Sequence, residues 1–339
     1  MITPSFSLTA TERVLPKMAL DFTTASLDPR VTFTRTGNTA TVTNSSGVIA
    51  AINANLPRFD YDPTTLVCKG LLIEEARTNL LLNSLIDGTN LATQLVTTTA
   101  VAHTLSFYGT GQIVLTGTSS ATVVGTGAYP SRKTLTFTPT AGVLTLTVTG
   151  TVQYAQLEVG VFPTSYIPTD ATSKTRNADV AVMTGTNFSS WFNQTQGSAY
   201  VEYNIPYALA SGAGVRVFTF LGAGGIGVDE MPMFVVQSTG KALSANAFTS
   251  SVNAGRIDST ASFVANTTLK ATFAYGSNAR AITANGLTTV TSTTAFTIPT
   301  CTNAGIGNSS TISQINGYIK KINYYPLKLT NAELQAFSK

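Results

Sequence analysis

The sequence predicts an all-β protein, and three of its properties favour that class. The chain of 339 residues is 43% hydrophobic and 11% charged, a composition that allows a buried core and argues against disorder. Threonine, valine, tyrosine and phenylalanine, which favour pleated, half-buried surfaces, are frequent. Runs such as LTLTVTGTV alternate apolar and polar residues and are broken by glycine or proline, as expected of antiparallel strands.

Three regions are expected from the order of these runs, in line with about two or three domains for this length. Residues 1–85 hold short β-like runs separated by glycine turn points and predict an N-terminal β module. Residues 86–170 alternate most strictly and predict a small β-sandwich. Residues 171–185 are polar, follow a segment with two prolines, and are expected to form a linker.

Residues 186–339 predict one larger sandwich with candidate strands such as SAYVEYNI, GVRVFTFLGA, LKATFAYG and YIKKINYYP. The ANG stretch at 284–286 predicts a tight hairpin turn, because Asn-Gly tolerates positive φ. Near the C-terminus, LTNAELQAF predicts a short helix capped by Thr330 or Asn331, with Glu333 in its first turn.

One stretch concentrates charge in this weakly charged chain, namely KGLLIEEARTNLLLNS at 69–84. A catalytic carboxylate pair needs one raised pKa, whereas the neighbouring arginines would keep both glutamates ionised. We therefore predict a structural clamp in which Arg58 or Arg77 binds Glu74 between leucines. An intersubunit contact and a ligand site are the alternatives. The predicted clamp consists of Arg58, Glu74, Glu75, Arg77 and Asn79.

The chain is poor in residues that could perform catalysis, and we expect no enzymatic activity and no catalytic or cofactor-binding residue. His103 is the only histidine, which disfavours histidine-dependent nucleophilic sites and histidine-based zinc sites. Cys68 and Cys301 are expected to be free thiols. Asp229 and Glu230 are adjacent, so on a strand they would point to opposite faces and could not share a cleft.

Two ligand sites remain open as alternatives. Calcium could be held by oxygens of Asp229 or Asn303, although no dense acidic loop is present. Trp191, the only tryptophan, is expected to pack against the edge of the third region, and a glycan platform is the alternative. No metal site is assigned.

Charge and hydropathy exclude two further classes of partner. The net charge is +4 without a basic cluster, so nucleic-acid binding is not expected. No run reaches the length of a membrane span. The N-terminus lacks a basic start followed by an apolar segment, so no signal peptide is expected.

The block from Arg35 to Ser84, with RTGNTATVTNSSGVI, NLPRFDYDP and GLLIEEARTNLLLNS, resembles an N-terminal module that recurs in bacteriophage tail, fibre and head-spike proteins. The segment AQLEVGVFPTSYIPT, Ala155 to Thr169, is similar to one that often follows it in a sandwich. Thr36 departs from the more common serine but keeps the hydroxyl. The resemblance implies that residues 1–85 serve attachment and assembly.

A second resemblance lies in the C-terminal region, in ITANGL, AGIGNSS and INGYIKKINYYPLKLTNAELQAF. These segments resemble the laminin-G-like branch of the concanavalin A-like sandwiches. The resemblance implies a jelly roll over 186–339. It implies little about function, because that fold hosts binders, hydrolases and inert modules.

Together the resemblances imply a non-enzymatic virion structural protein of a tailed bacteriophage, a fibre, spike or decoration protein assembled in the host cytoplasm. Such a protein would form a homo-oligomer, with a trimer favoured, and would contact other virion proteins. One alternative is a receptor-binding protein whose C-terminal sandwich binds a host cell-surface glycan. A polysaccharide depolymerase is the least favoured alternative.

Overall fold

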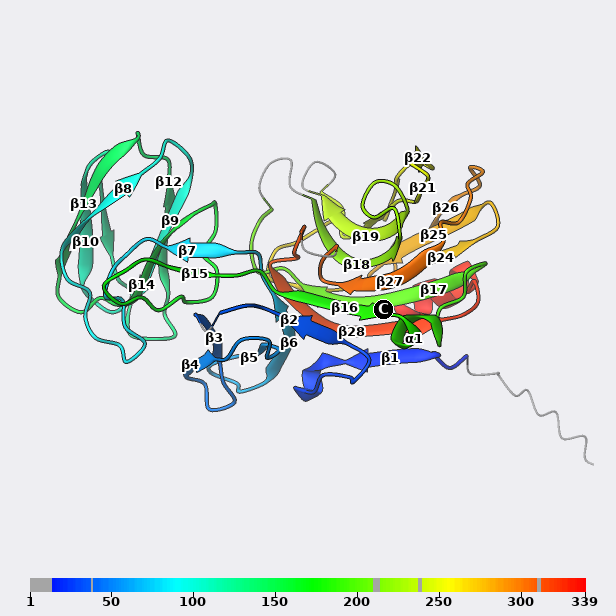
Figure 1. Cartoon of the computed structure of the whole chain (residues 1–339), viewed down its shortest axis with the longest axis horizontal. Coiled ribbons are helices and arrows are strands. Elements are labelled where there is room, and N and C mark those ends of the chain that lie inside the picture. Colours follow the sequence, from blue (N-terminus) through cyan, green and yellow to red (C-terminus); the bar gives the residue numbers. More distant parts are fainter. Residues whose placement is uncertain (1–13, 38, 210–213, 237–239, 310–311) are drawn as a thin grey trace, which may run out of the picture.

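The computed structural model describes residues 14–37, 39–209, 214–236, 240–309 and 312–339. These residues form a small and a large β-sandwich (Figure 1). The described helices are short: the 3-10 turn η1 (Phe22–Thr24), α1 (Thr186–Ser189) and α2 (Asn331–Phe337). The all-β prediction is therefore confirmed.

Two large sheets face each other in the large sandwich. In spatial order, the first sheet consists of β26 (Val290–Ser292), β25 (Ala279–Ala284), β24 (Thr268–Gly276), β17 (Gly197–Asn204), β28 (Gly317–Tyr325), β6 (Cys68–Ile73) and β5 (Phe59–Tyr61), with β1 (Met18–Asp21) also paired to β28. The second sheet consists of β2 (Thr32–Thr34), β16 (Val180–Thr184), β27 (Cys301–Ile306), β18 (Gly214–Gly222), β19 (Glu230–Val236), β20 (Ser244–Ala245) and β23 (Ile257–Asp258), with β21 (Phe248–Thr249) paired to β19 and to β22 (Val252–Asn253).

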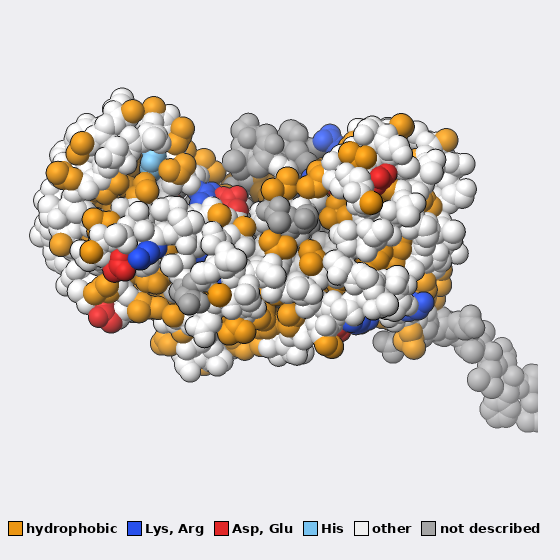
Figure 2. Space-filling view, in the orientation of Figure 1, with side chains coloured by type: hydrophobic (Ala, Val, Ile, Leu, Met, Phe, Trp, Pro, Cys, Tyr) orange, Lys and Arg blue, Asp and Glu red, His pale blue; other side chains and the backbone are white. Residues whose placement is uncertain are grey.

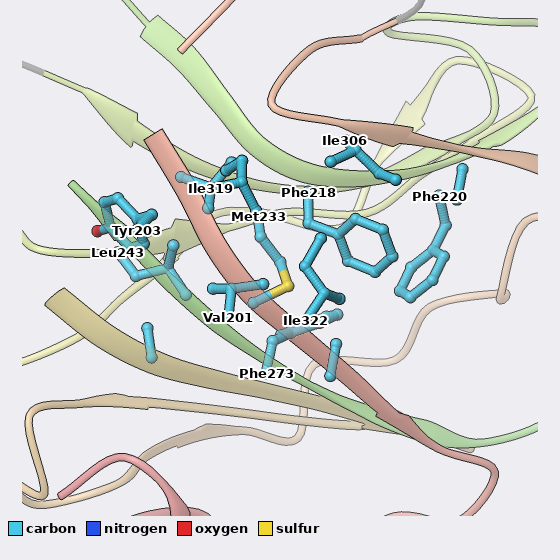
Figure 3. Packing of buried hydrophobic residues seen from close by; sticks show 14 of the residues in the cluster. Val201, Tyr203, Phe218, Phe220, Met233, Leu243, Phe273, Ile306, Ile319 and Ile322 are labelled. Atoms are coloured by element: carbon cyan, nitrogen blue, oxygen red, sulfur yellow. The ribbon is translucent and has the colours of Figure 1, made fainter. Parts of the chain in front are cut away.

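The core of the large sandwich lies between these sheets. Figure 3 shows Val201 and Phe273 of the first sheet close to Phe218, Met233 and Ile306 of the second. Strand β17 is buried along most of its length on both faces, because the outer face of its sheet is also partly covered. There α2 packs Leu334 into a smaller apolar cluster. Its Thr330 cap and Glu333 form the reciprocal capping box, which confirms the predicted helix start.

The small sandwich packs a four-stranded sheet against a three-stranded sheet. The first consists of β11 (Ala121–Val124), β10 (Gln112–Gly117), β13 (Gly142–Thr149) and β8 (Gln94–Thr98), and the second of β12 (Lys133–Phe137), β9 (His103–Tyr108) and β14 (Gln153–Val159). In β13, Leu144 and Leu146 are fully buried, and Thr147, the residue after Leu146, is exposed. This is the alternation that LTLTVTGTV predicts.

Two short ribbons lie near the junction of the sandwiches (Figure 1). They are β3 (Ala40–Thr43) paired with β4 (Ile49–Ile52), and β7 (Arg77–Asn79) paired with β15 (Lys174–Arg176). The chain therefore enters the small sandwich through β7 and leaves it through β15, and these two strands pair antiparallel.

The pairing of the N-terminal strands differs from the expected separation into three regions. Strands β1 and β6 both pair with β28, the last strand, and β2 pairs with β16. The expected linker, 171–185, contains β15 and β16 instead. Local periodicity does not reveal this arrangement, because partners hundreds of residues apart complete the two sheets.

The structure shows why the KGLLIEEARTN motif has a glycine at position 70, in β6. Its φ is +113°, and a Cβ at this position would lie 2.4 Å from the carbonyl oxygen of Ile319 in β28. Only glycine allows the two strands to approach this closely. The motif glycine therefore fixes the contact between the N-terminal segment and the last strand.

Candidate functional site

Five buried charged residues meet at the junction of the two sandwiches. Arg58 binds Glu74 at 2.7 Å and also pairs with Asp179. Glu74 lies 3.2 Å from Arg176, and Arg35 lies 3.1 Å from Asp179. None of the five is more than 3% exposed. We call Arg35, Arg58, Glu74, Arg176 and Asp179 the junction ion cluster.

Each member of the cluster sits where a strand begins or ends. Glu74 follows β6, and Asp179 directly precedes β16. The backbone joins these two residues in both directions: the Glu74 N–H donates to Asp179 Oδ2 at 2.9 Å, and the Asp179 N–H donates to the Glu74 carbonyl at 2.9 Å. Ser165 donates from its N–H and its hydroxyl to the two oxygens of Glu74, at 2.8 and 2.6 Å. The cluster thus ties β6, β16 and the segment after β14 together.

Glu74 is held as a carboxylate. Burial alone would raise its pKa, but the charges of Arg176 and Arg58 and the hydrogen bonds from Ser165 outweigh burial and lower the pKa to about 2. In return, Asp179 and Glu74 raise the pKa of Arg58 despite the burial of that side chain. A carboxylate with this pKa cannot act as a general acid near neutral pH.

This low pKa predicts that stability falls in acid. The pKa of Glu74 is about 2 in the folded protein and 4.5 in a model compound, so the folded state favours the ionised form. The stabilisation is therefore complete above about pH 4.5 and is lost as the pH falls toward 2, a change of up to about 3 kcal/mol. Urea unfolding between pH 6 and 2.5 measures it. Removal of Glu74 should flatten that pH dependence, and an unchanged slope would contradict the assignment.

The residues of the predicted clamp divide into two groups. Arg58 and Glu74 meet as predicted, but Arg77 binds Glu75 instead, at 2.5 Å. The amide of Asn79 donates to the carbonyls of Ala155 and Ile167 at 3.1 and 2.9 Å. Asn79 therefore bonds backbone carbonyls in and after β14 and takes no part in the ion pairs.

Sequence reasoning missed Arg35, Arg176 and Asp179. Arg176 and Asp179 lie in the segment that was expected to be a linker, where charged residues are ordinary. The available signal was the pairing of an arginine and an aspartate in TRNAD within a chain that is only 11% charged. Arg35 opens the block that carries the first resemblance.

A pocket adjoins the ion cluster, and Glu74 and Ser165 form part of its wall. Its volume is about 240 Å³. We call it the junction pocket. It is lined from the small sandwich by Tyr108, Tyr129, Arg132, Ser165 and Tyr166, from β3 to β6 by Thr41, Val42, Thr43, Ile49, Asp60, Lys69, Leu72 and Glu74, and from the large sandwich by Pro206, Tyr207, Asn316 and Tyr318.

The side chains on one wall of the junction pocket are already paired. Asp60 binds Lys69 at 2.6 Å and accepts a hydrogen bond from the Tyr318 hydroxyl at 2.8 Å. Lys69 lies 4.7 Å from the centre of the Tyr318 ring. The hydroxyls of Thr43 and Tyr129 are 2.9 Å apart. This wall combines aromatic faces with fixed hydrogen-bonding groups, which is typical of small-molecule sites.

The other residues considered from the sequence are placed away from any open site. Trp191 is 1% exposed and packs edge-on against Phe188 and Tyr324. It therefore presents no face to a sugar, and the glycan-platform alternative is corrected, since its ring is part of the core. His103 is buried, with Nδ1 2.8 Å from the Val101 carbonyl.

Among the residues that the structure describes, no group of three histidine, cysteine, aspartate or glutamate side chains could hold a metal ion. Asp229, considered for calcium, accepts a hydrogen bond from the Ser250 N–H at 2.9 Å. Cys68 and Cys301 are both free and buried. In the described part of the chain no helix is long and apolar enough to cross a membrane.

Comparison with known proteins gives structural similarities only. No family model matches the chain, and no curated protein matches it. The carbohydrate-binding module CBM40 of the Ruminococcus gnavus IT-sialidase, solved with α2,3 sialyllactose, is 14% identical, with a TM-score of 0.36, over 43% of this chain and 84% of the module. The K499G mutant of NanB sialidase from Streptococcus pneumoniae is 12% identical, with a TM-score of 0.38, over 47% of this chain and 26% of the sialidase.

A structure described as a receptor binding domain is 11% identical, with a TM-score of 0.37, over 47% of this chain and 39% of that one. With TM-scores below 0.5, these similarities do not indicate what this chain binds. What this chain binds is therefore inferred from its own residues.

Proposed function

We propose that this chain is a non-enzymatic structural protein of a tailed bacteriophage virion, a fibre, spike or decoration protein. One observation carries the proposal. The segments that resemble phage tail and spike proteins, Arg35–Ser84 and Ala155–Thr169, supply Arg35, Arg58 and Glu74 of the junction ion cluster and its partner Ser165. The recurring residues thus build a joint between two sandwiches.

A buried joint suits a structural subunit better than an enzyme. Charges removed from water need several partners to be tolerated, and in return they hold one arrangement of the chain. A spike or fibre subunit needs such a fixed arrangement between its anchored and displayed parts. Catalysis would instead need accessible titratable groups with matched pKa values, and Glu74 is buried with a pKa of about 2.

Homo-oligomerisation, with a trimer favoured, forms part of the proposal. Figure 2 shows few charged side chains on the displayed face of the molecule, where hydrophobic and uncharged atoms predominate. A weakly charged surface lowers the desolvation cost of large protein–protein contacts. Sheet edges such as β26 and β23 have a strand on one side only within the described residues, and copies of the chain could cover them.

The proposal predicts that the chain is present in purified virions of the phage or prophage that encodes it. Peptide mass spectrometry of gradient-purified particles measures its copy number, and immunogold electron microscopy with antibody against the chain locates it. A copy number divisible by three is expected. Particles that lack the chain while the same lysate contains it would overturn the proposal. Native mass spectrometry of the pure protein tests the trimer separately.

A second candidate function, attachment to a host surface glycan, is favoured by the junction pocket. Its wall combines tyrosine rings with hydroxyl and charged groups, and aromatic rings beside a few fixed polar groups suit a sugar. This function does not compete with a structural role, because a virion spike can carry a binding site.

A further inference from the structure

We propose that the junction pocket binds a sugar unit that bears a carboxylate, and that Arg132 holds that carboxylate. The inference rests on the second candidate function above. It is carried by the size of the pocket and by two kinds of group in its lining: an arginine that pairs with no carboxylate of the described residues, and tyrosine hydroxyls that bond none of them.

Arg132 differs from the arginines of the ion cluster. Its Nη1 donates to the carbonyl of Thr164 at 2.8 Å, and its Nη2 donates to the hydroxyl of Ser106 at 2.8 Å. Both acceptors are neutral. Among the described residues no carboxylate lies within ion-pair distance of Arg132, whereas Arg35, Arg58 and Arg176 each pair with one. A guanidinium carries more N–H groups than these two bonds use.

The nearest acidic side chains are committed to other partners. Glu74 binds Arg58 and Arg176. Glu158 accepts hydrogen bonds from the N–H and hydroxyl of Thr164 and from the amide of Gln156. A partly buried cation without an ion-pair contact of its own is costly. A planar carboxylate in the pocket would accept the remaining protons of Nη1 and Nη2 in the fork geometry that arginine prefers.

The tyrosines favour a sugar as the carrier of this carboxylate. Within the described part of the chain, the hydroxyls of Tyr108 and Tyr207 have no hydrogen-bond partner, although both residues line the pocket. Tyr207 is held in place by stacking on Phe162, with ring centres 4.7 Å apart. Tyr108 meets Tyr129 edge-on at 5.2 Å. Fixed rings with free hydroxyls can pack on the C–H face of a pyranose and bond its hydroxyls.

The volume limits the occupant. At about 240 Å³, the pocket is smaller than sites for drug-sized ligands, which span roughly 300–1,000 Å³. It therefore suits one sugar ring, such as the terminal or branching unit of a longer chain. The Asp60–Lys69 pair in the pocket lining offers both an acceptor and a donor to ring hydroxyls.

Isothermal titration calorimetry of the full chain tests the inference with methyl glucuronide and methyl galacturonide as probes. The matching neutral probes are methyl glucoside and methyl galactoside, which differ only at the carboxylate. We expect at least one uronide to bind roughly 10- to 100-fold more tightly than its neutral counterpart, because a hydrogen-bonded charge is lost in the neutral sugar.

Variants of the pocket assign the effect to named residues. Arg132→Met should remove the preference for the uronide, and Arg132→Lys should restore part of it, because lysine keeps the charge but not the fork. Tyr207→Phe should weaken both classes of sugar without changing the preference. Arg30→Met is the matched control, because Arg30 pairs with Asp28 outside the pocket. Circular dichroism checks that each variant is folded.

Three results would overturn the inference. The folded protein could bind no uronide, it could bind neutral and acidic sugars equally, or the preference for the uronide could persist undiminished in folded Arg132→Met. None of these results bears on virion location. The chain could be found in particles with an empty pocket, so failure of this inference is distinguishable from failure of the structural function.

Discussion

Glu74→Ala should lower the free energy of unfolding by about 3–5 kcal/mol, the usual cost of removing one partner from a buried ion pair. Glu74 is 3% exposed and neutralises Arg58 and Arg176, both of which are fully buried. Without it, two guanidinium groups and the Ser165 hydroxyl lose their shared acceptor. Chemical denaturation of the full chain, monitored by tryptophan fluorescence and circular dichroism, measures the change.

Glu75→Ala is the matched control, since it removes the same group from the neighbouring position. The Glu75 side chain is 37% exposed and pairs with Arg77 near the surface, where an ion pair contributes about 0–1 kcal/mol. A large effect at Glu74 with a small effect at Glu75 identifies the cluster as the cause. Equal stability of the Glu74→Ala protein and the unchanged protein would show that the cluster does not hold the joint.

The charge-rich motif shows how far local reasoning reaches. The combination of glutamates, arginines and leucines at 58–80 was sufficient to predict that Arg58 or Arg77 binds Glu74, and Arg58 does so in the structure. It was not sufficient to choose between Arg58 and Arg77, because the direction of a side chain depends on strand pairing. Arg77 lies in β7 and turns toward Glu75, while Arg176 arrives from the paired strand β15.

The strand pattern shows the same limit at larger scale. Alternation predicted the small sandwich well, because strands such as β13 have one buried and one more exposed face. In the large sandwich, β17 is buried along most of its length on both faces, and its neighbour β28 pairs in turn with β1 and β6 from the N-terminal end of the chain. Periodicity carries no information on such distant partners. Likewise, Trp191, the only tryptophan, was considered for a binding role from the sequence, but the structure buries it in the core.

The fragment 186–339 should fail to fold cooperatively by itself. Seven buried core residues of the large sandwich precede residue 85: Met18, Leu20, Phe22, Val31, Phe33, Leu71 and Ile73. Burial of side chains of this kind contributes roughly 1.5–3 kcal/mol each, which sums to about the whole stability of a typical domain, 5–15 kcal/mol. The fragment also lacks β16, which pairs with β27, and β1 and β6, which pair with β28, so β27 and β28 would each expose an unpaired edge.

Fragment 76–170 provides the contrast, because the core of the small sandwich lies entirely within Leu81–Leu157. We expect this fragment to show a single cooperative thermal transition. Fragment 186–339 should show none and should bind a hydrophobic dye, because the inner faces of its sheets are uncovered. The full chain, which also contains residues 1–85 and 171–185, should show the cooperative transition that fragment 186–339 lacks. If fragment 186–339 instead unfolded at the temperature of the full chain, the N-terminal strands would contribute little to the stability of the large sandwich. The large sandwich would then fold independently, and the ion cluster would join two finished domains rather than help to build one.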